Sequence, residues 1–459
     1  MWNRSFHLLC LLAVSLAFSW PASADPKTGQ NVGQKIGLDA RLALPVMQAG
    51  APQKNYLRVA LQGCQPEPNQ ARTPVNVAFV IDRSGSMQGD RIAQAKAAAI
   101  MAVSRLDHRD IAAVVMFDDT ADVVMQAQPV HNSALFINAI QQIYARGSTA
   151  IHAGVLVGAN EVRRYKEPQR LNRVILLSDG QANRGPSRPA DFSVLGAALL
   201  HDGISVSTIG LGLGYNEDLM LALARAGDGN HAFAREPTDL VQIFNKEFDD
   251  VLASCAQTVS IDIELKPGVR VVRALSRDGT IDGNRAQFHM NQVYAATEHY
   301  VLMEIEADKD LGPTLGNGEQ ELGIVKVAYT LPGSGTRETQ DTHIRARLGA
   351  TEEEVKAGAD KTVAEAVVEQ VTRGRTQEAI LLRDAGKTEE ANKLLMQNAA
   401  EINAYVKSAP GASQRLRDLE GQYSAMGSAL APASPSQLGL QRKVLRSLEN
   451  TGAGSSTRY

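Results

Sequence analysis

Three oxygen-bearing side chains follow one apolar stretch of this sequence within five residues. Asp82, Ser84 and Ser86 come directly after the run Val-Ala-Phe-Val-Ile at residues 77–81. Because that run is continuous and rich in branched side chains, it predicts a strand buried on both faces. In an open parallel sheet, ligands bind beyond the carboxyl ends of the strands. Small hard cations take oxygen ligands, so this loop predicts a divalent-cation site.

The elements around this loop predict an α/β fold. Residues 75–254 alternate strand and helix patterns, which is typical of βαβ units around a parallel sheet. Two further apolar runs, at residues 111–117 and 174–178, are expected to be buried strands of the same sheet. We therefore predict a doubly wound, three-layer, Rossmann-like domain over residues 75–254, with Asp82 at the carboxyl end of a central strand.

The loop Asp82–Met87 (Asp-Arg-Ser-Gly-Ser-Met) resembles the metal-ion-dependent adhesion site of von Willebrand factor type A domains. Two later loops extend the resemblance in family order. Gly147-Ser148-Thr149 is similar to the family's second loop, and Asp179, after an apolar strand, is similar to its third. The resemblance covers most of the α/β segment. It implies that five residues hold the metal: Asp82, Ser84, Ser86, Thr149 and Asp179.

The implied ligands define the chemistry of the site. Two carboxylates neutralise a +2 ion, while three hydroxyls add little charge and leave the metal electrophilic. Because the site is small and poor in carboxylates, Mg²⁺ is expected in preference to Ca²⁺, and Mn²⁺ could replace it. In this family one coordination position is left for a carboxylate of a protein partner. The alternative is that Ser84 and Ser86 cap the following helix and that the two aspartates stabilise turns.

Other functions find little support in the sequence. The H-E-x-x-H, G-x-x-x-x-G-K-[ST] and G-x-S-x-G motifs are all missing, so we do not expect an enzyme. Residues 210–214 (Gly-Leu-Gly-Leu-Gly) lack dinucleotide spacing and predict a close-approach turn. A net charge of −3 without a basic stripe argues against nucleic acid as a partner. Asp118 and Asp119 are predicted to lie in a solvated turn, and Arg83 at the rim of the site or in solvent.

Residues 1–24 are predicted to be a signal peptide. Arg4 precedes the apolar residues 8–18, and Ala22-Ser23-Ala24 is a cleavage motif, with cleavage after Ala24. The alternative, a retained anchor over residues 6–21, is short for a membrane span. No later stretch is long and apolar enough to cross a bilayer. The mature protein is therefore expected to be periplasmic or secreted, without a transmembrane segment.

Removal of this peptide leaves two cysteines, Cys64 and Cys255, which flank the α/β segment. In an oxidising compartment an even pair of cysteines predicts a disulfide. The alternative is two free thiols.

The flanking regions predict a second and a third structural unit. Residues 25–73 and 257–347 alternate apolar and polar side chains, which predicts one β-sandwich into which the α/β domain is inserted, with the cysteines at the neck. Residues 351–450 are predicted to be helical and to pack on the sandwich, because a short helical hairpin cannot bury its own apolar face. Residues 451–459 are expected to be a disordered tail.

The whole-chain plan resembles that of bacterial exported von Willebrand factor type A proteins similar to calcium-activated chloride channels. Without a pore-forming segment, chloride conduction is not expected. The predicted function is an exported, metal-dependent protein-binding module for adhesion or assembly, which captures an acidic group (Asp or Glu) of its partner. The alternative is a structural, scaffolding envelope protein whose metal only stabilises the α/β domain.

Overall fold

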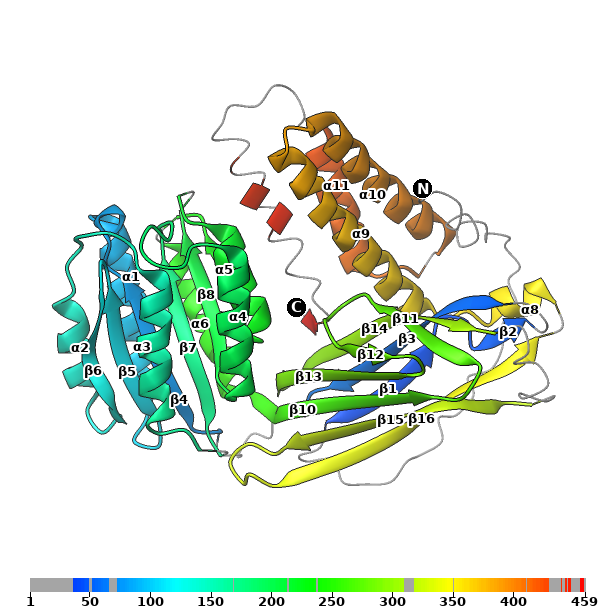
Figure 1. Ribbon diagram of the computed structural model, residues 1–459, viewed down its shortest axis with the longest axis horizontal. Helices are drawn as coiled ribbons and strands as arrows, with labels where there is room; N and C mark the ends of the chain where they lie inside the picture. Colours follow the sequence, from blue (N-terminus) through cyan, green and yellow to red (C-terminus); the bar gives the residue numbers. More distant parts are fainter. Residues whose placement is uncertain are drawn as a thin grey trace.

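The computed structural model describes residues 36–48, 52–65, 72–308 and 318–428, apart from the single residues 168, 213, 237, 350 and 410. Near the end of the chain it also describes residues 439, 442, 443, 445, 446 and 455–457. Within these residues an α/β domain, a β-sandwich and a helical region can be distinguished (Figure 1). The predicted signal peptide lies outside the described residues.

The α/β domain is built on a six-stranded sheet whose order is β6-β5-β4-β7-β8-β9. Its central strand β4 (Val75–Asp82) is buried at every position, as its continuous apolar sequence predicts. All neighbouring strands are parallel except β6, which is antiparallel to β5. The other strands are β5 (Ile111–Phe117), β6 (Ala121–Pro129), β7 (Leu171–Ser178), β8 (Ser205–Leu211) and β9 (His231–Ala234).

Helices cover both faces of this sheet, which confirms the three-layer prediction. One apolar core lies under α1 (Asp90–Ser104), α2 (Ser133–Gln141) and α6 (Asp239–Leu252). A second core lies under α3 (Ile151–Arg163), α4 (Pro189–His201) and α5 (Glu217–Ala226). Helix α3 approaches the sheet closely through Gly158, where a Cβ atom would lie 2.5 Å from Cγ2 of Val80.

The β-sandwich is assembled from strands on both sides of the α/β domain, which confirms the predicted insertion. Strand β3, before the domain, pairs with β14, after it, over ten residue pairs. The sheet orders are β1-β3-β14-β11 and β12-β13-β10-β15-β16-β2. The strands are β1 (Gly37–Leu42), β2 (Val46–Gln48), β3 (Gln53–Gln62), β10 (Ser254–Leu265), β11 (Val269–Ala274), β12 (Thr280–Asp282), β13 (Arg285–Tyr294), β14 (Thr297–Ala307), β15 (Gln320–Thr330) and β16 (Arg337–Gly349).

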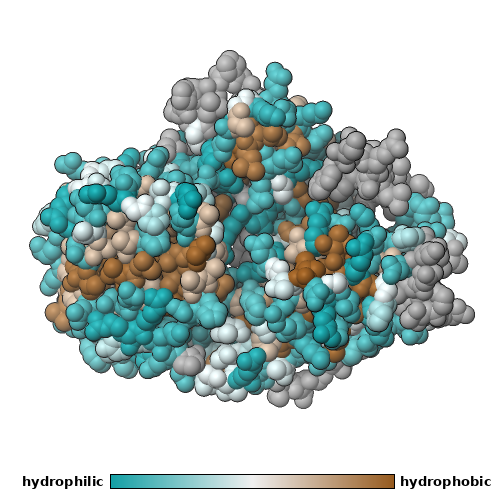
Figure 2. Space-filling view, viewed as in Figure 1, coloured by the Kyte–Doolittle hydropathy of each residue, from teal (hydrophilic) through white to brown (hydrophobic). Residues whose placement is uncertain are grey.

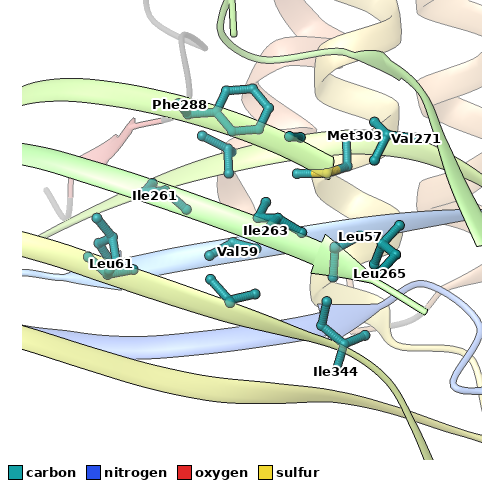
Figure 3. Close-up of a cluster of buried hydrophobic side chains, with 14 of the residues drawn as sticks. Leu57, Val59, Leu61, Ile261, Ile263, Leu265, Val271, Phe288, Met303 and Ile344 are labelled. Carbon is teal, nitrogen blue, oxygen red and sulfur yellow. The ribbon is translucent and has the colours of Figure 1, made fainter. Parts of the chain in front are cut away.

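Figure 3 shows the sandwich core, in which side chains of the two sheets interdigitate. Leu57 and Val59 of β3 meet Ile261 and Ile263 of β10, and each of the four is almost completely buried. On β10 these apolar residues alternate with exposed Asp262 and Glu264. The alternation of apolar and polar residues in β10 therefore reflects one buried and one solvated face of this strand.

A disulfide closes the neck between the sandwich and the α/β domain. Cys64 and Cys255 are bonded, with Cα atoms 5.9 Å apart and 191 residues between them in the sequence. Arg173, in β7, adds a buried polar contact across the same junction. Its guanidinium donates to Gln292 (3.0 Å) and Tyr294 (2.5 Å) of β13. The amino ends of the sheet are thus tied to the sandwich, and Asp82 lies at the opposite end.

The C-terminal region is helical, as predicted, and packs on the outer face of the sandwich. Its helices are α8 (Glu352–Ala357), α9 (Lys361–Asp384), α10 (Thr388–Ser408) and α11 (Gln414–Ser428). Val363 and Val367 of α9 are buried against Tyr300 and Leu302 of β14. Gln370 donates to the Tyr300 hydroxyl at 2.9 Å. The α10–α11 hairpin forms its own apolar core with the other end of α9.

The end of the chain differs from its predicted disorder. Within residues 451–459, Ser455–Thr457 form strand β17, which pairs antiparallel with Thr297–His299 of β14. Strand β11 pairs with β14 only over Met303–Ala307 and leaves the edge of β14 at residues 297–299 for β17. An open strand edge offers unpaired backbone groups to any extended segment, whatever its side chains.

Figure 2 shows that hydrophobic residues gather in a band across the helices of the α/β domain on the face in view. Exposed apolar side chains of this domain include Leu156 in α3 and Val194 in α4, at 37% and 71% exposure. Among the described helices, none is long and apolar enough to cross a bilayer.

We predict that His299, buried in the sandwich near the neck, makes stability fall with acid. Burial, together with the positive charge of Arg277, lowers the pKa of His299 to about 4, although the negative charges of Asp228 and Glu298 oppose this shift. Because this pKa lies below that of an unfolded histidine, about 6.5, the unfolded chain binds the proton first. The stability that neutral His299 contributes is therefore lost as the pH falls from about 6.5 towards about 4.

In urea titrations between pH 4.5 and 7, His299→Gln should flatten the decline of the free energy of unfolding, by up to about 1.4 kcal/mol per pH unit. His289→Gln, at an exposed position of β13, is the control, because substitution of an exposed residue should change the free energy of unfolding little across this pH range. Equal slopes for wild type and His299→Gln would contradict the prediction.

Candidate metal centre

Asp82 occupies the end of the central strand, and its side chain is completely buried. Its Oδ1 accepts a hydrogen bond from the Ser84 backbone N–H at 2.7 Å, and its Oδ2 accepts one from the Ser178 hydroxyl. Both of these donors are neutral. The turn that follows, η1 (Gly85–Met87), is short and leads into α1.

The serines do not cap a helix. Ser84 is the N-cap residue of η1 but makes no side-chain capping hydrogen bond, and α1 begins after Gly89. Instead, the hydroxyls of Ser84 and Ser86 lie 3.0 Å apart, and Ser86 donates to Oδ1 of Asp179 at 2.7 Å. The capping alternative is therefore wrong for the two serines. They form a chain of oxygens from the first loop to the third.

Thr149 reaches the same place because the second loop is held by backbone contacts. The Gly85 N–H donates to the Gly147 carbonyl at 3.0 Å, which joins the first two loops. Asn183, in the third loop, accepts from the Thr149 N–H at 2.8 Å. A methyl group on Gly180 would lie 3.0 Å from Oγ1 of Thr149 and 3.4 Å from Oδ2 of Asp82. All five predicted residues thus meet at one edge of the sheet.

The charge on this edge is only partly compensated. Burial raises the pKa of Asp82 to about 6, hydrogen bonds from Ser178 and Ser84 oppose that rise, and the negative charge of Asp179 adds to it. Asp179 is also buried, and its partner is the guanidinium of Arg91, 2.6 Å from Oδ2. A buried carboxylate without a cationic partner is costly. The residues present therefore fit a cation between the loops.

A divalent cation would be held here by Asp82 and Asp179, with hydroxyl oxygens from Ser84, Ser86 and Thr149. When bound, it supplies a Lewis-acidic position that attracts an anionic oxygen. Within the described part of the chain, no group of three or more His, Cys, Asp or Glu side chains could hold a metal by itself. Hydroxyl groups are consequently essential to this donor set.

The structure corrects the interpretation of Asp118 and Arg83. Both are buried, at 3% and 7% exposure, rather than solvated. Arg83 lies 2.9 Å from Oδ2 of Asp118, and Arg146 contacts the same oxygen at 2.9 Å. Asp118 also accepts from the Thr120 N–H, and its carbonyl accepts from Ala150. This ion pair braces the first and second loops beneath the predicted ligands.

Sequence reasoning missed three residues of the site: Ser178, Asn183 and Arg91. Ser178 directly precedes Asp179, so its position at the strand end was a usable signal. Arg91 is the second residue of α1, nine residues after Asp82, and only the fold brings it to Asp179. Gly210, the first glycine of the predicted close-approach turn, lies in β8, and a Cβ atom on it would lie 2.3 Å from the Tyr215 ring.

Comparison with known proteins identifies the α/β domain and the fold. Residues 76–246 match the model of the von Willebrand factor type A domain. An uncharacterised protein of Synechocystis is 27% identical over 312 residues, which cover 66% of this chain and 72% of the relative. The uncharacterised protein YfbK of Escherichia coli is 27% identical over 42% of this chain, and the match spans 34% of that protein.

Two solved structures share the fold across nearly the whole chain. A von Willebrand factor type A protein from Catenulispora acidiphila has a TM-score of 0.71 and 17% identity, and the match covers 94% of this chain and 99% of that one. The ArnB paralog VWA2 from Sulfolobus acidocaldarius has a TM-score of 0.61 and 16% identity, covering 91% and 99%.

Residues 76–246 form a von Willebrand factor type A domain, and this domain lies between strands of the β-sandwich. Domains of this family commonly bind a divalent metal at the edge where the three loops meet, and commonly mediate protein–protein interactions.

We predict that Asp82→Asn stabilises the metal-free protein. Because the folded pKa of Asp82, about 6, lies above the unfolded value of 3.8, its ionisation costs stability as the pH rises through that interval. At pH 7 the amide should raise the free energy of unfolding by about 1–3 kcal/mol, and at pH 4 the gain should largely disappear.

Urea denaturation in EDTA measures this effect, with Asp119→Asn, on the neighbouring exposed loop, as the control. With Mg²⁺ in place of EDTA, the wild type should gain stability and Asp82→Asn should not. Destabilisation of the metal-free variant at pH 7 would show that Asp82 is a structural turn residue.

Proposed function

We propose that this protein is an exported binding module that captures an acidic side chain of a protein partner through a divalent cation, Mg²⁺ in preference to Ca²⁺ or Mn²⁺. The observation that carries the proposal is the convergence of Asp82, Ser84, Ser86, Thr149 and Asp179 from three loops, with Asp82 buried and in contact with neutral donors only. The role is binding rather than catalysis.

The position of this edge supports a binding role. Strand β4 runs eight residues from the neck to Asp82, which is about 26 Å at the usual rise of a strand. The site therefore lies at the end of the domain opposite the sandwich. Arg146 and Arg184 stand beside it on the second and third loops, with side chains 68% and 60% exposed. Their charges favour the approach of an acidic surface.

Two features support export to a periplasmic or extracellular location. The predicted signal peptide ends at Ala24, and the Cys64–Cys255 disulfide is of a kind that persists in oxidising compartments. On this proposal the mature chain begins at Asp25. It carries the metal-binding domain over residues 75–254, between two parts of a sandwich at residues 25–73 and 257–347.

Capture of envelope proteins on immobilised residues 25–459 tests the proposal. We expect a partner to be retained with Mg²⁺, lost with EDTA, and lost with Asp179→Ala while circular dichroism remains unchanged. Asp202→Ala, which breaks an exposed ion pair with Arg163 at the far end of α4, is the matched control and should retain the partner.

The chemistry of the partner is tested by amidation. Blocking the carboxylates of the captured proteins with a carbodiimide and glycine amide should abolish metal-dependent retention. A partner that binds equally with EDTA and with Asp179→Ala would show that the metal is structural. The sandwich and helical region would then be the working surface of a scaffolding protein.

A further inference from the structure

A short basic segment near the end of the chain joins the helical region to the metal-binding domain. Arg442, Lys443 and Arg446 pair with carboxylates at the start of α5, whereas Leu445 packs among the C-terminal helices. Leu445, 1% exposed, is buried in the apolar core of α9, α10 and α11. The side chain of Lys443, 2% exposed, is buried against the metal-binding domain. Neighbouring residues of one segment are therefore anchored in different units.

Lys443 occupies a pocket made by the start of α5 and the residues before it. Its Nζ donates to the Tyr215 carbonyl at 3.0 Å and to Oε2 of Glu217 at 2.7 Å. The same ammonium group lies 3.7 Å from the centre of the Tyr215 ring. A buried lysine is usually costly, but here a carboxylate, a carbonyl and an aromatic face all meet it.

Two arginines extend the contact on either side of Lys443. Arg442 pairs with Glu217, with Asp218 at 2.7 Å and with Asp384, at the end of α9, also at 2.7 Å. Arg446 lies 2.8 Å from Asp218. The aromatic ring of Tyr215 and the carboxylates of Glu217 and Asp218 are thus shared among three cations of the segment. Charge-assisted pairs of this kind give both strength and register.

The pocket adjoins the third loop of the metal site. Asn216, between Tyr215 and Glu217, donates its backbone N–H to the Gly180 carbonyl at 3.4 Å. A methyl group on Gly214 would lie 3.4 Å from the carbonyl oxygen of Asp179, and one on Gly212 would lie 3.5 Å from the guanidinium of Arg91. The loop between β8 and α5 therefore packs against Asp179 and against the arginine that faces it.

We propose that Arg442, Lys443 and Arg446 form a basic strap, that Tyr215, Glu217 and Asp218 form its docking pocket, and that docking holds the β8–α5 loop in the arrangement that presents Asp179 to the metal. Through the strap, the helical region and the metal site are energetically coupled. The docking stands on the contacts themselves, whereas the coupling rests on the proposed metal-binding function.

Limited digestion with trypsin of the full-length mature protein tests the docking, because trypsin cleaves after lysine and arginine. In the wild type the strap is shielded. The double variant Glu217→Gln/Asp218→Asn keeps all three cleavage positions but removes the charges of the pocket. We expect cleavage after residues 442, 443 or 446 to accelerate at least about tenfold, because the charge pairs that hold the segment in its pocket are lost.

Lys443→Met is a second variant, which retains the apolar stem and the two arginine sites and should also accelerate cleavage. Asp202→Asn is the matched control on the same domain and should leave the cleavage rate unchanged. Circular dichroism identifies any variant that has failed to fold. Unchanged cleavage in both folded pocket and strap variants would overturn the docking.

Calorimetric titration with Mg²⁺ tests the coupling on the same proteins. Both undocked variants should bind Mg²⁺ several-fold more weakly than the wild type and Asp202→Asn, and Mg²⁺ should in turn slow cleavage of the wild-type strap, since linkage is reciprocal. Faster cleavage with unchanged Mg²⁺ affinity would overturn the coupling. A wild type that binds no Mg²⁺ would overturn the proposed function and the coupling with it, while the trypsin result would still decide the docking.

Discussion

A negative charge buried at the end of a fully buried strand is the constraint on which the structure of this protein depends. Asp82 has no exposed surface, and its contacts are a backbone N–H and a hydroxyl. Neutral donors stabilise a carboxylate less than a cation does. The neighbouring loops bring hydroxyls to the same edge, and they also bring a second carboxylate, whose negative charge increases the need for a cation there. The buried Arg83–Asp118 pair holds those loops in place.

The same domain is restrained at both of its ends. At the neck, the disulfide and the buried Arg173 contacts tie the amino ends of the strands to the sandwich. Beside the candidate metal site, Lys443 is buried against α5, and Leu445, two residues later, is buried among the C-terminal helices. An inserted domain would otherwise be free to move about its two connections. Here the neck and the Lys443 contact both contain buried polar groups, and burial of these groups is stable only while their partners stay in place.

Local patterns identified the elements well where burial followed a simple period. The continuous apolar run of β4 and the alternation in β10 predicted different kinds of strand, and both were correct. Prediction failed where one residue type fits two environments. Asp118 follows a strand, as many solvated turn residues do, but it is buried between two arginines. Ser455–Thr457 has no strand pattern, and an open edge of β14 recruits it.

The sequence by itself determined the α/β fold with its inserted topology, the disulfide partners, and the loops on which Asp82, Thr149 and Asp179 lie. The loop of Thr149 follows from the family resemblance, whereas the other features depend on periodicity, on strand ends or on a count of cysteines, all of which are local. Only the tertiary structure decided which cationic side chains meet which hydrogen-bond acceptors. Arg91 reaches Asp179, Arg173 reaches Gln292 and Lys443 reaches Glu217 across 88, 119 and 226 residues of sequence. A charged side chain carries no local mark of its partner, because burial and pairing are properties of the assembled fold.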